Sequence, residues 1–172
     1  LFVFAKDSDT KELAEKHGAD FFSVELTPAN YRDVLTPYLH AGDLMVNVSI
    51  NVSSLDLIKL CAEHRVLYVD SSVEPWGGLF DNSQTTLYER SNFAIRQELL
   101  ALIASQPPGA PTAVTDHGAN PGIVTHFVKQ ALLNLEHDIR GGTTCPTTPG
   151  EWAKLAQQLG ITTIQISERD SQ

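Results

Sequence analysis

The fold class follows from residues 43–70, which read DLMVNVSINVSSLDLIKLCAEHRVLYVD. Leu44 to Ser49 is a short apolar run that predicts a buried strand, and Val66 to Val69 predicts a second one. Between them, Ser53 and Ser54 are residue types that cap helices, and the apolar positions after them recur at helical spacing. A strand, a helix and a strand in this order are typical of a parallel sheet, because parallel strands need a crossover connection.

The same alternation extends toward the N-terminus. Leu1 to Ala5 and Phe21 to Leu26 predict two further strands. The helix between them is expected to begin at the cap Asp9-Thr10 and to end at Gly18. A helix through residues 27–38 then leads to the segment quoted above.

The C-terminal half is less regular. We expect a long helix over residues 85–104, a short strand at 112–115, a helix from Pro121, a helix over 151–159 and a strand at 161–166. The whole pattern predicts an α/β, Rossmann-like, doubly wound fold with a mostly parallel sheet. Such folds open with a strand followed by a G-x-G-x-x-G turn, and no such turn follows the predicted strand at Leu1 to Ala5.

The composition predicts one main domain in the cytoplasm. The 172 residues are 42% hydrophobic, and Cys61 and Cys145 have no CxxC or histidine-rich neighbourhood, so free thiols and no metal site are expected. No apolar run approaches the roughly 20 residues that span a bilayer. The net charge of −9, with only 12 Lys and Arg, argues against a nucleic-acid partner and slightly favours a small cation.

A polar, glycine-rich turn joins the predicted strand at 112–115 to the next helix. It reads DHGANPG from Asp116 to Gly122. Asn120, Pro121 and Gly122 supply a possible cap, a proline and a flexible residue at a helix N-terminus, where free N–H groups can meet a polar ligand. The alternative is an ordinary well-capped helix.

Three segments of this chain resemble the bacterial homospermidine synthases, which belong to the saccharopine dehydrogenase-like group of nicotinamide-binding proteins. They are DLMVNVSINVSS at 43–54, LYVDSSVEPWGG at 67–78 and TDHGANPGIVTHFVKQALL at 115–133. The resemblance implies that the chain is an internal fragment whose Gly-rich turn precedes Leu1. Residues 1–140 would then be a partial NAD-binding domain, and 141–172 the start of a substrate or dimerisation region. A homodimer is expected from the resemblance alone.

The cofactor is expected to be NAD, bound at the carboxyl ends of the strands. Asp7 is the candidate for the adenosine ribose, with Asp9 as its rival, and either could instead cap a helix. Ser49 and Ile50 follow a strand and are expected to line the nicotinamide-ribose part of the groove, although an ordinary turn is the alternative. The remaining predicted cofactor-binding residues are Asp70, Thr115 and His117.

Carboxylates and aromatic faces bind a primary ammonium ion, and the segment after Val69 contains both. Asp70, Glu74 and Trp76 suit an ammonium ion through charge-assisted hydrogen bonds and a cation–π contact. Asp70 could simply end a strand, and Trp76 could belong to the core. The resemblance makes Glu74 and Asn120 the candidate catalytic residues.

The predicted substrate-binding residues are Asn51, Glu74, Trp76 and Asn120. At Asn51 the resemblance implies a carboxylate, and an amide there would hold a diamine less tightly because it carries no net charge. A histidine beside Asn120, His117, could move protons or could merely pack.

The resemblance implies that bound NAD accepts a hydride from putrescine, ammonia leaves, a second putrescine condenses, and the hydride returns to give homospermidine. One alternative is a saccharopine-type or carboxynorspermidine-type dehydrogenase, which would consume a nicotinamide. A substrate carboxylate would need a basic partner, and Arg90, Arg96 and Lys129 occupy no obvious position for one. Another alternative is a non-catalytic nucleotide-binding module.

Overall fold

The computed structural model describes residues 1–142 and 145–169. The chain folds into two compact units, Leu1–Thr115 and Asp116–Gln172. The division predicted at 140/141 falls inside the second unit, and the roles assigned to those two regions stay predictions. Within the described ranges, no helix is long and apolar enough to cross a membrane.

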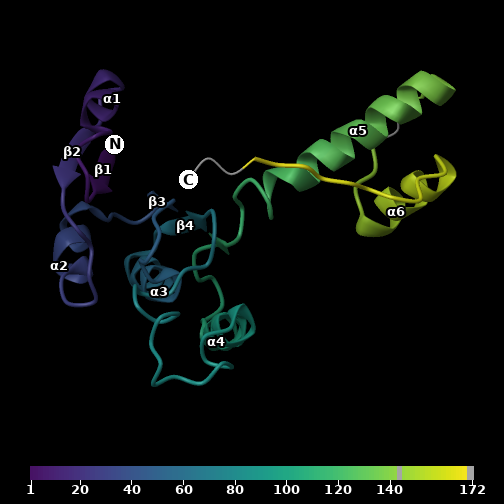
Figure 1. Cartoon of the computed structure of the whole chain (residues 1–172). Helices are drawn as coiled ribbons and strands as arrows, with labels where there is room; N and C mark the ends of the chain where they lie inside the picture. Colours follow the sequence, from purple (N-terminus) through teal and green to yellow (C-terminus); the bar gives the residue numbers. More distant parts are fainter. Residues whose placement is uncertain (143–144, 170–172) are drawn as a thin grey trace. The chain divides into compact units, whose positions relative to one another are not determined.

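The first unit is an α/β structure in which each pair of neighbouring strands is parallel (Figure 1). This confirms the predicted fold class. Two sheets form, one in the order β1-β2 and one in the order β3-β4-β5. The elements are β1 (Phe2–Ala5), α1 (Lys11–Lys16), β2 (Asp20–Ser23), α2 (Tyr31–Leu35), the 3-10 helix η1 (Thr36–Tyr38), β3 (Leu44–Asn47), α3 (Ser54–His64), β4 (Leu67–Asp70), α4 (Asn92–Ser105) and β5 (Ala113–Val114).

The core of the first unit lies around α3. Leu60 and Val66 are completely buried, and Cys61 is 1% exposed, as expected for a cysteine that packs in a helix. Burial raises the pKa of the Cys61 thiol to about 12, so this thiol stays protonated at neutral pH. Tyr31 and Leu35 of α2 join the same cluster. The core therefore connects α2, which lies in the sequence between the strands of the two sheets, to the second sheet and α3.

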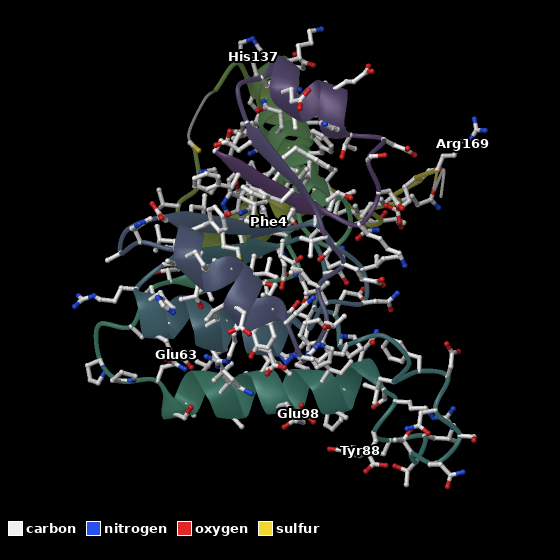
Figure 2. The ribbon with its side chains drawn as sticks, turned by 90° about the vertical axis from the view of Figure 1, so that its left-hand side faces the viewer. Phe4, Glu63, Tyr88, Glu98, His137 and Arg169 are labelled. Carbon is white, nitrogen blue, oxygen red and sulfur yellow. The ribbon has the colours of Figure 1, made fainter. Side chains whose placement is uncertain are left out.

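An ion pair adds a second link between α2 and α3. The guanidinium of Arg32 donates to the two carboxylate oxygens of Glu63 at 2.7 and 3.0 Å, and Glu63 is labelled in Figure 2.

Aromatic rings pack on the first sheet. Phe4, also labelled in Figure 2, stacks on Phe22 and meets the ring of Tyr38 edge-on at 5.3 Å. Aromatic packing thus holds η1 against β1 and β2.

Two predicted elements of the first unit differ from the structure. The strand at Leu44 is not fully buried, because Leu44 and Val46 lie on one face and are 58% and 60% exposed. The helix predicted from residue 85 begins only at Asn92, after the cap Ser91, whose hydroxyl accepts from the Ala94 N–H at 3.2 Å. Residues 85–90 instead form turns, in which the Glu89 carboxylate accepts hydrogen bonds from Thr86.

The second unit consists of α5 (Ile123–Arg140), α6 (Pro149–Gln158) and an extended segment, 161–169. The strand predicted at 161–166 is wrong, because this segment has no hydrogen-bonded strand neighbour among the described residues. Figure 1 shows the yellow segment after α6 running back along α5. Ile161, Ile164 and Ile166 line an apolar groove there with Phe127 and Leu132 of α5. These three isoleucines therefore line a groove beside α5, and no β-sheet among the described residues includes them.

Candidate functional site

The loops after β3 and β4 leave the sheet at the same edge, because the two strands are parallel and in register. Their backbones are joined twice. The Ser71 N–H donates to the Asn47 carbonyl at 3.2 Å, and the Gly77 N–H donates to the Asn51 carbonyl at 3.1 Å. The predicted cofactor loop and the predicted substrate loop therefore form one continuous patch of backbone.

Ser54, the first residue of α3, holds the backbone of Glu74. The Ser54 N–H donates to the Glu74 carbonyl at 2.9 Å, and the Glu74 N–H donates to the Ser54 hydroxyl at 3.1 Å. The same hydroxyl donates to the Ser72 carbonyl at 3.4 Å. Ser54 is fully buried. The sequence indicates only a helix cap at Ser54, and the one further signal for it is that it is the second serine of the pair Ser53-Ser54.

The Glu74 side chain is half-buried, and its carboxylate is available for a cation. Its Oε1 atom accepts from the Ser72 hydroxyl at 3.4 Å. Among the described residues, no Lys, Arg or His forms an ion pair with Glu74. A partly desolvated carboxylate without a positive partner is a suitable acceptor for an ammonium group.

Trp76 packs against the core next to this loop. Its ring lies 5.4 Å from that of Tyr31, and its indole N–H donates to an Asp56 carboxylate oxygen at 2.7 Å. Asp56 in turn accepts from Lys59 at 3.3 Å. These contacts show that Trp76 packs against the core, which was the alternative prediction for this residue. A cation–π contact between Trp76 and a substrate stays a prediction.

Asn51 turns the backbone of the loop after β3. Its φ of 63° lies in the left-handed region, which asparagine tolerates better than most residues. A Cβ at Gly77 would lie only 3.2 Å from the Cβ of Asn51, so Gly77 allows the two loops to approach closely. Ser49, Ile50 and Asn51 are exposed at this edge. They are accessible to a ligand, as the prediction of their role requires.

A buried polar network that the sequence did not reveal lies beneath this loop. The Asn47 amide N–H₂ donates to the Tyr68 hydroxyl at 3.1 Å, and the Tyr68 hydroxyl donates to Asp70 Oδ2 at 3.0 Å. The Asn47 amide oxygen accepts from the N–H of Ser49 at 3.1 Å and from its hydroxyl. Burial is the main cause that raises the pKa of Tyr68 above its ordinary value, so its hydroxyl remains a donor. Asp70 is 1% exposed.

The acidic residues after β1 are on the surface. Asp7 and Asp9 are both exposed. The alternative prediction, that one of them caps a helix, is wrong. The N-cap residue of α1 is Thr10, and no side chain forms a cap hydrogen bond there. Their role toward a ribose stays a prediction.

The turn before α5 belongs to the second unit and is built around Gly122. With a φ of 128°, a Cβ at this position would lie 2.4 Å from the Gly118 carbonyl oxygen, so only glycine fits. The N-cap residue is Gly122, and no side chain caps the helix, so the cap predicted for Asn120 is wrong. The N–H groups of Ile123 and Val124 donate instead to the Gly118 and Ala119 carbonyls at 2.8 and 3.0 Å. These donors are therefore not free for a ligand.

Asn120 is exposed in this turn, and its amide N–H₂ donates to Glu168 Oε1 at 3.3 Å. His117 is also exposed, and its ring lies 5.4 Å from that of His126, nearly perpendicular to it. Thr115, the last residue of the first unit, is half-buried. The roles predicted for Asn120, His117 and Thr115 stay predictions.

Comparison with known proteins gives the family. Residues 2–114 match the family model of the saccharopine dehydrogenase NADP binding domain. The chain is 43% identical over 175 residues to homospermidine synthase from Blastochloris viridis, covering 100% of this chain and 36% of that protein. It is 40% identical over 172 residues to homospermidine synthase from Mesorhizobium japonicum, covering 97% of this chain and 35% of that protein.

A solved structure agrees with these sequence matches. The crystal structure of homospermidine synthase from Legionella pneumophila in complex with NAD matches with a TM-score of 0.68 and 35% identity, covering 91% of this chain and 31% of that chain. The resemblance inferred from the three segments is confirmed. The chain spans about a third of the length of the relatives it matches. Because the family model matches well over half of its residues, this chain belongs to the saccharopine dehydrogenase NADP binding domain family.

Proposed function

We propose that this chain is part of a homospermidine synthase, which joins two putrescine molecules into homospermidine and ammonia with NAD as a recycled cofactor. The carboxylate of Glu74 carries the proposal, because it lies in the loop after the carboxyl end of β4 without an ion-pair partner among the described residues. Similarity to two homospermidine synthases over the whole chain supports it.

The residues at the strand ends fit NAD. Ser49 and Ile50 are exposed after β3, where open α/β sheets place their ligands, and they would line the nicotinamide ribose. The exposed carboxylate of Asp7 after β1 would accept hydrogen bonds from the adenosine ribose, which favours NAD over NADP. Thr115 and His117 are further proposed contacts. When bound, NAD would accept and later return a hydride.

Glu74 would hold one ammonium group of putrescine and so orient the carbon that loses the hydride. A charge-assisted hydrogen bond fixes the direction of the diamine as well as its position. Asn51, whose loop is joined to that of Glu74 through Gly77, would accept a hydrogen bond from an ammonium group with its amide oxygen. The ring of Trp76 would add a cation–π contact from its half-buried position.

In the second unit, Asn120 would orient a polar group of the substrate or of the nicotinamide. Its amide N–H₂ donates to Glu168 Oε1, and this bond would favour one orientation of the side chain. His117, beside His126, would move a proton when ammonia leaves or when the second amine attacks. By resemblance alone, the proposed enzyme is a cytoplasmic homodimer.

The family match favours a second candidate, a saccharopine-type dehydrogenase that consumes its nicotinamide. A substrate carboxylate would then need an Arg or Lys. The two candidates predict different products when the full-length protein is incubated with putrescine and substoichiometric NAD. Homospermidine and ammonia with no net NADH would support the synthase. NADH that accumulates in proportion to another amine product would support the dehydrogenase and contradict the proposal.

A further inference from the structure

We propose that Asn47, Tyr68 and Asp70 are positioning residues that hold the loop of residues 49–51 in the shape that binds the nicotinamide side of NAD. The inference deepens the proposed function and rests on it. It also gives Asp70 an indirect role, because its 1% exposed carboxylate lies below the loop and not on its surface.

The chemistry of the groups fixes the direction of the hydrogen bonds in this network. The Tyr68 hydroxyl donates its single proton to Asp70 Oδ2. The oxygen of Tyr68 can then act only as an acceptor, and the amide N–H₂ of Asn47 donates to it. The amide oxygen of Asn47 is left to face Ser49, where it accepts from both the N–H and the hydroxyl. Reversing the Asn47 amide would break the bonds on both of its sides.

The network connects the core to the exposed loop. Tyr68 is 2% exposed and Asn47 is 6% exposed, whereas Ser49 is exposed. Asn47 and Asp70 are register partners at the last residue pair of β3 and β4, and their strands are joined further by the Ser71 N–H on the Asn47 carbonyl. The orientation of the Asn47 side chain is therefore determined by buried groups of the neighbouring strand.

Asn47 also determines how the chain leaves β3. An asparagine oxygen that accepts from the N–H two residues later closes an Asx-turn, which fixes the backbone direction after a strand. The turn is followed by Asn51 in the left-handed region, whose carbonyl is bound by Gly77. Three exposed residues are thus presented in one geometry before a ligand arrives, which lowers the entropy cost of binding.

The test exchanges the amide and the carboxylate in the full-length protein. In Asn47→Asp, two buried carboxylates compete for the one Tyr68 proton, and we expect the Kd of NAD to rise by about tenfold, the effect of one lost buried hydrogen bond. In the double variant N47D/D70N, the new carboxylate at position 47 accepts from Ser49 and Tyr68, while the new amide at position 70 donates to the Tyr68 oxygen. Each of these bonds then has a partner again, so we expect the Kd to return to within about threefold of wild type.

A core variant controls for stability. Ile58→Val shortens a buried side chain of α3 that makes no polar contact, so it should lower the melting temperature and leave the Kd of NAD unchanged. The KM of putrescine should change less than the Kd of NAD in Asn47→Asp. Where Asn47→Asp does not fold, Tyr68→Phe makes the same test, because it removes only the hydroxyl that joins the two residues.

The outcomes separate this inference from the function on which it rests. Wild-type protein that fails to bind NAD would overturn both. Wild-type protein that binds NAD, with Asn47→Asp or Tyr68→Phe binding it equally well, would overturn the positioning role alone. A double variant whose Kd for NAD stays as high as that of Asn47→Asp would also overturn the positioning role alone. Recovery in the double variant, with the Ile58→Val control unaffected, would support the role.

Discussion

Ser54 binds both sides of the Glu74 peptide backbone: its N–H donates to the Glu74 carbonyl at 2.9 Å, and its hydroxyl accepts from the Glu74 N–H at 3.1 Å. The first turn of α3 therefore sets the position of the carboxylate proposed to bind the substrate. Because Ser54 is fully buried, water cannot replace these bonds without a change in structure.

Ser54→Ala should weaken substrate binding through this backbone contact. It leaves the Glu74 N–H without its acceptor, which costs about 1–3 kcal/mol for a buried donor. We expect a raised KM for putrescine in steady-state kinetics and a lower melting temperature. The matched control is Ser53→Ala, which removes the cap bond to the Asp56 N–H and should cost about 0.5–2 kcal/mol of stability. An equal rise in the KM of putrescine in both variants would contradict a specific role for Ser54.

Glu74→Gln should weaken putrescine far more than NAD. Removing the charge that pairs with a desolvated ammonium is expected to cost on the order of 2–5 kcal/mol. Glu63→Gln is the control, because that carboxylate belongs to an exposed ion pair with Arg32. The measurement is the Kd of each ligand by calorimetry. Equal losses for the two ligands would rule out the proposed role of Glu74.

Asn120→Ala is expected to lower the turnover number more than it weakens binding of either ligand. The amide would act by orienting reacting groups, and such effects appear mainly in kcat. Glu168→Gln, which keeps an oxygen acceptor for the Asn120 amide, should have a smaller effect. An unchanged turnover number in Asn120→Ala would show that this residue has no function in the reaction.

Gly122→Ala should destabilise the second unit, because the new Cβ would lie 2.4 Å from a backbone oxygen and the φ of 128° is strained for alanine. We expect a loss of about 1–3 kcal/mol or more, measured by denaturant unfolding. Gly141→Ala is the comparison, since that glycine has a φ of 67° with open space around its Cβ position. A loss no greater than that of Gly141→Ala would contradict the steric argument.

The pair of Arg32 and Glu63 predicts a small pH effect on stability. The hydrogen bond from Arg32 lowers the pKa of Glu63, so its stabilising contribution is present above the ordinary glutamate pKa and is lost as the pH falls through the lowered value. Both side chains are about half exposed, which limits the contribution to under about 1 kcal/mol. The stability difference between wild type and Glu63→Gln should therefore vanish in acid. A difference that persists at low pH would contradict the ion pair as its cause.

The elements with local signals could be predicted from the sequence. Ser53 caps α3 as expected, because its hydroxyl reaches the N–H of a residue only three positions away. The parallel strands around α3 follow from the same short segment. The predicted start of α4 was wrong, because residues 85–90 form turns and the helix begins only after the cap Ser91.

The missed parts depend on residues distant in sequence. The network of Asn47, Tyr68 and Asp70 exists only because register pairs the ends of β3 and β4. Ile164 and Ile166 have the spacing of apolar residues in a strand, yet they lie along α5, which no local pattern reveals. Asn120 has a residue type that caps helices, but the carbonyls of Gly118 and Ala119 already bind the first donors of α5.

Deuterium transfer tests the central claim most directly. The full-length protein would be incubated with putrescine deuterated at both amine-bearing carbons and with catalytic unlabelled NAD, and the products would be identified by mass spectrometry. A borrowed hydride returns to the new carbon–nitrogen bond, so the account predicts homospermidine that retains its deuterium and no net NADH. Deuterium that accumulates in reduced cofactor, or homospermidine that has lost it, would contradict the account.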